Sequence, residues 1–302
     1  MIDIIIPCYK SQETIHRCLG SILSQSSLLG CKVTLVHDGE NVYNLSYPLD
    51  IQELTYSENK GPGYARNYGL EHTSEKYVMF LDSDDMLANP FVLTTLCNNI
   101  KDYDFLIGNI AQVKADGSIK ILKGNRNFLH GKIYSREFLE KNNIRFKECS
   151  CCEDSSFNLM CFCLSDNYTA MYFDAYAWMY NSNSLGRKDV LTWEFCTVPQ
   201  ALSENHAFVF EELKKRNYFN DKILFETTMA MIQAILIWIH NTHNYPQFKK
   251  ENDAALRRFY KVYKEVQDKV SDELFRKAYE TFQPNGNPDV DVPIVKEVLD
   301  SL

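Results

Sequence analysis

The chain has 302 residues, of which 45% are hydrophobic and 24% are charged, and its formal net charge is −8 at pH 7. This length fits one large domain or two of ordinary size, and the composition is that of a globular protein. The acidic balance argues against a broad basic surface, so nucleic acid is not an expected partner.

Two features bear on cellular location. The N-terminal apolar run is short and has no basic segment before it, unlike a signal peptide. The most apolar helical stretch, 229–239, is shorter than the about 20 residues that span a bilayer. We therefore expect no transmembrane segment and a cytoplasmic location, with peripheral binding at the inner membrane face as a further option. The ten cysteines should then stay reduced, and the group at 149–163 lacks the paired C-x₂-C spacing of structural zinc sites.

The first 110 residues alternate between strand-like and helix-like segments. Residues 2–6 form an apolar, β-branched run that ends at Pro7, and Ser11 stands where it can cap the following helix. Further strands are predicted at 32–37, 51–57 and 76–81, and a glycine-rich loop at 59–63 leads into a helix. This alternation predicts an α/β fold with a doubly wound, mostly parallel, Rossmann-like sheet.

An acidic stretch follows the fourth predicted strand. Asp82, Asp84 and Asp85 come directly after the apolar run 78–81. Unpaired carboxylates this close repel one another, and a hard cation such as Mg²⁺ or Mn²⁺ relieves the repulsion. Because Mg²⁺ is commonly held by one or two carboxylates and substrate phosphates, the stretch indicates a metal–diphosphate site. The alternative is a solvated acidic turn that caps the next helix, since Asp-x-Asp is a short motif.

Three loops, 7–9, 37–39 and 82–85, each follow a predicted strand. The carboxyl ends of parallel strands meet at one crevice of an open α/β sheet, which favours the metal–diphosphate interpretation. The chain lacks the Gly-x-Gly-x-x-Gly and Gly-Lys-Ser/Thr fingerprints, so dinucleotide-binding and P-loop folds are disfavoured.

The pattern changes beyond residue 104. Strands are predicted at 104–109 and 172–180, a hairpin turn at 115–118, and helices at 135–142 and from Glu153 onward. Later helices are predicted at 203–215, 221–242, 247–268 and 271–282. The predicted domains are therefore an α/β domain, 1–190, and a mostly helical domain, 191–302.

The motifs of residues 1–190 resemble, in their order, those of glycosyltransferase family 2, the inverting enzymes of GT-A fold that use nucleotide-sugars. The resemblance rests on the segments 4–10, 18–26, 36–39, 59–67, 80–85, 132–134, 143–146 and 153–154. Two positions depart from the family pattern, because His37 replaces a usual Asp and Lys10 replaces a usual Asn. Residues 191–302 match no pattern of this family.

The resemblance implies a nucleotide site around the first strands. It places Pro7 at the base or ribose, and it lets Asp38 accept a hydrogen bond from the base, with an Asx turn as an alternative or additional role for Asp38. Tyr9 is an aromatic residue at a strand end and is suited to stack on the base. Arg66 is suited to phosphate and is placed beside the nucleotide, whereas the alternative is a cation on a helix surface.

The resemblance also assigns roles to the residues of the acidic stretch. It makes Asp84 the principal metal ligand, turns Asp82 toward the ribose or the metal, and includes Ser83 in the donor site. Lys132 and His130 border the donor phosphates or the acceptor, with a scaffold role as the alternative.

Asp154 is the expected catalytic base, because an inverting transfer needs a carboxylate that takes the proton of the acceptor hydroxyl. The alternative is that Glu153 and Asp154 are an acidic pair at a helix N-terminus, which the helix dipole favours.

The expected function is metal-dependent inverting transfer of a sugar from a nucleotide-diphosphate sugar, UDP-linked, to a hydroxyl acceptor such as a glycan, with Mn²⁺ or Mg²⁺. A nucleotidyltransferase is a second option, but that class needs a basic, glycine-rich phosphate loop near the N-terminus, which this chain lacks. A non-catalytic nucleotide-sugar-binding module is a third, and the carboxylates at 38, 82, 84 and 154 speak against it. The helical region could shape an acceptor site, pair subunits into a homo-oligomer or rest on a membrane.

Overall fold

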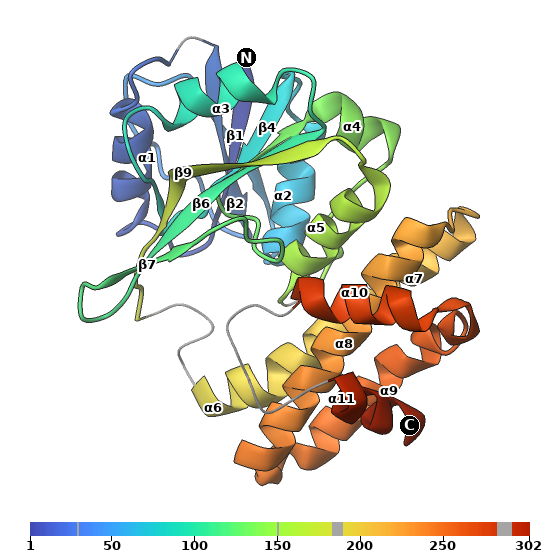
Figure 1. Ribbon diagram of the computed structural model, residues 1–302. Coiled ribbons are helices and arrows are strands. Elements are labelled where there is room, and N and C mark those ends of the chain that lie inside the picture. Colours follow the sequence, from blue (N-terminus) through green and yellow to red (C-terminus); the bar gives the residue numbers. More distant parts are fainter. Residues whose placement is uncertain (29, 150, 183–189, 283–291) are drawn as a thin grey trace. The chain divides into compact units, whose positions relative to one another are not determined.

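The computed structural model describes residues 1–28, 30–149, 151–182, 190–282 and 292–302 (Figure 1). The chain divides into two compact units, Met1–Ser182 and Asn183–Leu302. The expected boundary near residue 190 adjoins the segment 183–189, which lies outside the described residues.

Four parallel strands form one half of the sheet in the first unit. They are β1 (Ile2–Cys8), β2 (Cys31–Asp38), β3 (Ile51–Tyr56) and β4 (Tyr77–Phe80), in the order β3-β2-β1-β4. The register pairs Cys8 with His37 and Ile5 with Phe80, so the carboxyl ends of these strands share one edge. This half of the sheet is the parallel arrangement that the sequence predicted.

The other half of the sheet is mixed. It contains β5 (Met86–Leu87), β6 (Phe105–Val113), β7 (Ile119–Leu122), β8 (Lys132–Ser135) and β9 (Tyr168–Trp178). β8 runs antiparallel to β4 and β6, β7 antiparallel to β6, β5 antiparallel to β9, and β9 parallel to β6. Short links favour antiparallel neighbours, because a parallel pair needs a crossover of about a dozen residues or more. The predicted hairpin turn joins β6 to β7, where Lys114 N donates to Ser118 O at 2.9 Å.

Helices cover both faces of the parallel half. One face of β1, with Ile4 and Ile6, packs in one buried cluster with α1 (Ile15–Leu23) and α3 (Val92–Ile100). The other face packs on α2 (Pro62–Glu71), where a Cβ at Gly69 would lie 2.5 Å from Ile5 Cγ2. The α/β, GT-A-like fold class is therefore confirmed for this unit.

The predicted cap of the first helix was wrong. α1 begins at Ile15 after Thr14, whose side chain makes no capping bond. The Ser11 hydroxyl instead lies 2.7 Å from that of Ser83, 72 residues further along the chain. The later helix α4 (Arg136–Lys141) is capped by Ser135, and α5 (Glu153–Leu164) follows.

The second unit is helical, as predicted. Its described elements include α6 (Val190–Thr192), a π-helical turn (Trp193–Thr197), α7 (Val198–Lys215), α8 (Asp221–Asn244), α9 (Lys249–Tyr263), α10 (Asp272–Phe282) and α11 (Val292–Asp300), with 3-10 turns at Pro246–Phe248 and Gln267–Lys269. α8 is long and apolar enough to cross a membrane by length and composition, but 56% of its apolar window is buried in the protein. A core helix of a globular unit has the same properties.

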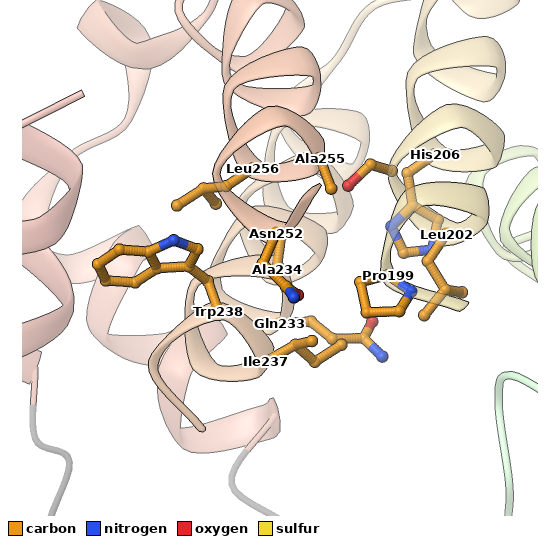
Figure 2. A pocket seen from close by; sticks show the side chains of 11 residues that line it. Pro199, Leu202, His206, Gln233, Ala234, Ile237, Trp238, Asn252, Ala255 and Leu256 are labelled. Atoms are coloured by element: carbon orange, nitrogen blue, oxygen red, sulfur yellow. The ribbon is translucent and has the colours of Figure 1, made fainter. Parts of the chain in front are cut away.

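A narrow hollow lies between α7, α8 and α9. Figure 2 shows His206 from α7, Trp238 from α8 and Asn252 from α9 around it. Most of the lining is apolar, and burial lowers the pKa of His206 to about 4. The predicted site residues, by contrast, all belong to the first unit.

Candidate active site

The acidic stretch forms a tight turn after β4. The backbone N–H of Asp85 donates to the carbonyl of Asp82 at 3.0 Å. The turn leaves Asp82 and Asp84 half-buried, whereas Asp85 is 2% exposed. Three acids within four positions thus receive different surroundings.

Asp82 is held by the Arg66 guanidinium and the His130 imidazole. Arg66 Nη2 donates to Asp82 Oδ1 at 2.7 Å, and His130 Nε2 lies 3.1 Å from Asp82 Oδ2. Burial alone would raise the pKa of Asp82, but Arg66 and His130 outweigh burial and hold this pKa well below its usual range. Asp82 is therefore ionised at neutral pH.

Asp85 has the opposite character. Its carboxylate accepts from the Tyr176 hydroxyl at 2.8 Å and from the Met179 N–H at 2.7 Å. Burial raises the pKa of Asp85 to about 7, against the opposing influence of His130. Ligand atoms of Asp82, Asp85 and His130 all lie within 4.8 Å of one another. Two carboxylates and an imidazole fit a divalent cation such as Mn²⁺.

Asp84, the predicted principal ligand, does not belong to that group. Its carboxylate accepts from Asn181 Nδ2 at 2.8 Å, and Arg17 donates to its backbone carbonyl. Burial and the neighbouring Asp82 raise the pKa of Asp84. The turn directs Asp84 toward the end of β9, so its role as a ligand stays a prediction.

A buried bridge connects the acidic turn to α5. Arg66 Nη1 donates to Glu153 Oε1 at 2.5 Å, while its Nη2 binds Asp82. A Cβ at Gly63 would lie 2.7 Å from Lys147 O and 3.3 Å from Glu153 Cγ, so glycine allows α2 to approach this segment. Asn67, one residue after Arg66, makes paired 2.9 Å bonds to the Phe146 backbone. Arg66 thus bridges two carboxylates in this structure, and its contact with a phosphate stays a prediction.

Asp154 lies at the N-terminus of α5, as predicted. Burial, followed by the charge of Glu153, raises the pKa of Asp154 to about 6, with His130 and Arg66 opposing them. Cys152, which precedes the helix, has a left-handed φ of 61°, a conformation that is costly for a residue other than glycine. The same two side chains, His130 and Arg66, act to lower the pKa of both Asp82 and Asp154, which puts both carboxylates in one electrostatic environment.

The residues predicted to bind the nucleotide have different surroundings in the structure. Tyr9 is 48% exposed, with the Lys10 amine 4.9 Å from its ring centroid, and Pro7 pairs with Val36 across β1 and β2. Ser83 meets the Ser11 hydroxyl, as described above. The Asp38 carboxylate accepts from Tyr56 Oη, Asn59 Nδ2, Lys60 N and Gly61 N at 2.7–3.1 Å. Four donors use the acceptor capacity of a carboxylate. In this structure Asp38 holds the glycine-rich loop in place. A base N–H would have to displace one of these four donors to bind Asp38.

Lys132 is not a surface residue of the crevice. It is fully buried in β8, and its amine donates to the Phe128 carbonyl. Burial lowers the pKa of Lys132 to about 7. Lys132 occupies a core position, because β8 lies between β4 and β6 in the sheet, and its contact with the donor stays a prediction.

Sequence reasoning missed the contribution of β9. Tyr176 donates to Asp85 and accepts from the Asp82 N–H at 3.1 Å, and Asn181 binds Asp84. The predicted strand 172–180 was an available signal, but nothing local indicated that its end faces a loop more than 90 residues earlier.

Comparison with known proteins identifies the family of this chain. The family model described as glycosyl transferase family 2 matches residues 3–158. Glycosyltransferase GlyA of Streptococcus pneumoniae is 32% identical over 116 residues, which cover 36% of this chain and 16% of the relative. The minor teichoic acid biosynthesis protein GgaA of Bacillus subtilis is 40% identical over 103 residues, 29% of this chain and 22% of the relative. These matches span less than a quarter of either relative.

Solved structures show the same fold. S. aureus TarS residues 1–349, in complex with UDP-GlcNAc, is 18% identical with a TM-score of 0.57, covering 100% of this chain and 83% of that one. At this identity the likeness establishes the fold alone. The family model covers more than half of the sequence, and this chain therefore belongs to glycosyl transferase family 2.

Proposed function

We propose that this protein transfers a sugar, with inversion, from a UDP-sugar to a hydroxyl group of a glycan acceptor, and that the transfer depends on a divalent metal. Family membership supports sugar transfer, and the TarS complex with UDP-GlcNAc supports the choice of donor class. The observation that carries the proposal is the Arg66 bridge, which joins the acidic turn to the helix that bears Asp154.

Asp154 is the proposed base. Its pKa of about 6 leaves the carboxylate mostly ionised at neutral pH yet basic enough to take a proton from the acceptor hydroxyl. The hydroxyl oxygen then attacks C1 of the sugar from the face opposite the diphosphate. General-base assistance of this kind contributes about 10²–10⁴ in rate.

The donor is proposed to lie along the carboxyl ends of β1, β2 and β4. Tyr9 offers an open ring for the base, and the ionised Asp82 faces the ribose or the cation. Asp82, with Asp84 or with Asp85 and His130, would hold Mn²⁺ or Mg²⁺, which would neutralise charge on the leaving diphosphate.

The test is hydrolysis and transfer with a panel of nucleotide-sugars, with and without Mn²⁺. We expect metal-stimulated release of UDP, faster when a glycan is present. Binding without turnover would favour the non-catalytic module, and release of pyrophosphate from a nucleoside triphosphate would favour the nucleotidyltransferase. A homo-oligomer through the helical unit stays a prediction, which size-exclusion chromatography with light scattering checks.

A further inference from the structure

Four aromatic rings stand beside the acidic turn, and we call them the aromatic wall: Phe128, His130, Tyr176 and Trp178. His130 stacks on Tyr176 with ring centroids 4.4 Å apart. The Trp178 ring lies 5.4 Å from His130 and 5.1 Å from Phe128. The wall therefore begins at the residues that bind Asp82 and Asp85 and continues away from them.

The two inner rings, Tyr176 and His130, already contact carboxylates of the acidic turn. Tyr176 is fully buried and donates to Asp85, and His130 is 9% exposed and contacts Asp82. The two outer rings, Phe128 and Trp178, are only half-buried. Within the described part of the chain, the Trp178 indole N–H has no hydrogen-bond partner. This N–H is not fully buried. The outer rings pack against the hydrophobic core on one side, but they stay partly exposed, and the Trp178 indole N–H is a free donor.

A sugar ring fits this combination. An aromatic face is electron-rich and attracts the C–H groups on the apolar face of a pyranose, and an indole N–H can donate to a ring hydroxyl. The four wall residues include no lysine or arginine, so the wall is poorly suited to a chain of phosphates. Its position next to Asp82 and Asp85 makes it continuous with the candidate active site.

We propose that Phe128 and Trp178 form the platform on which the terminal sugar ring of the acceptor stacks. The acceptor is then a pyranose-bearing glycan and not a ring-free polyol phosphate. This inference rests on the proposed function and specifies its acceptor.

The experiment compares methyl β-glucopyranoside and methyl N-acetyl-β-glucosaminide with glycerol 3-phosphate as acceptors for the full chain. We expect transfer to a pyranoside and none to glycerol phosphate. Trp178→Ala should raise the KM for the pyranoside about tenfold while the KM for the donor stays unchanged. Trp178→Phe, which keeps an aromatic face, should recover most of the loss. Tyr172→Ala is the matched control, because Tyr172 is 83% exposed in the same strand.

Thermal melting identifies any variant that does not fold, and Phe128→Ala then provides a second disruption of the platform, with an expected rise in pyranoside KM. An unchanged pyranoside KM in folded Trp178 and Phe128 variants would overturn the inference. A rise in the donor KM alone, or transfer by the wild type to glycerol phosphate only, would also overturn it. If the wild type neither hydrolyses nor transfers from any nucleotide-sugar, the proposed function itself fails and this inference fails with it.

Discussion

Arg66 donates a 2.7 Å hydrogen bond to the carboxylate of Asp82, although the two residues lie on different elements, α2 and the turn after β4. The Arg66 side chain is 6% exposed, and its second arm reaches Glu153. One buried cation therefore sets the position of the acidic turn relative to the helix that carries Asp154.

Replacement of Arg66 should destabilise the fold. Arg66→Ala leaves the Asp82 and Glu153 carboxylates without their partner, and breaking a buried pair costs about 3–5 kcal/mol. Urea unfolding measures the change. The matched control is Arg145→Ala, whose pair with Glu140 is largely solvated, so its cost should stay within about 1 kcal/mol. Equal effects of the two substitutions would show that the Arg66 bridge contributes no more than a surface pair.

Substitution of Asp154 should separate turnover from binding. Asp154→Asn is expected to keep nucleotide affinity, measured by calorimetry, and to lower kcat by about 10²–10⁴. In the wild type, kcat should fall as the pH drops below about 6, because the base is then protonated. Equal losses of affinity and kcat would place the base elsewhere.

The same carboxylate affects stability with a definite sign. Its pKa is raised from 3.8 to about 6 in the folded state, so the fold loses stability as the pH rises between these two values, and Asp154→Asn should not destabilise the protein at pH 7. Glu153→Gln is the contrasting neighbour, because it removes a partner of Arg66 and should lower the unfolding free energy.

The cation can be located by two substitutions. We expect Asp84→Ala to lower Mn²⁺-dependent affinity for a UDP-sugar more than His130→Gln does, with the exposed Asp102→Ala as a control for net charge. Calorimetric titration of the UDP-sugar with and without Mn²⁺ measures the difference. Unchanged metal dependence in Asp84→Ala, together with its loss in His130→Gln, would assign the cation to Asp82, Asp85 and His130.

Buried Lys132 should make stability depend on pH. Its pKa falls to about 7, so between pH 7 and about 10 the unfolded chain binds a proton that the folded chain does not, and this group favours folding increasingly as pH rises. Lys132→Met should therefore gain most stability relative to the wild type at pH 7, and the gain should shrink by about 1 kcal/mol per pH unit. Exposed Lys114→Met is the control, with a change within about 0.5 kcal/mol. A gain that does not vary with pH would contradict the buried, neutral amine.

Local sequence patterns located most elements well. The predicted strand 51–57 is β3 at Ile51–Tyr56, and the predicted helix 221–242 is α8 at Asp221–Asn244. Apolar runs and helical spacing depend on neighbours within a few residues, so a single sequence displays them. Lys10 has a left-handed φ of 54°, a conformation that Asn tolerates better than Lys.

By itself the sequence determined the family, the parallel half of the sheet, the helical character of the second unit and the edge of the sheet at which the carboxylates gather. Only the tertiary structure decided that Arg66 bridges Asp82 and Glu153, that Lys132 is buried, and that β9 closes the acidic turn. The physical reason is that these interactions join segments tens of residues apart, where side-chain direction depends on how the strands and helices pack. No local pattern carries that information.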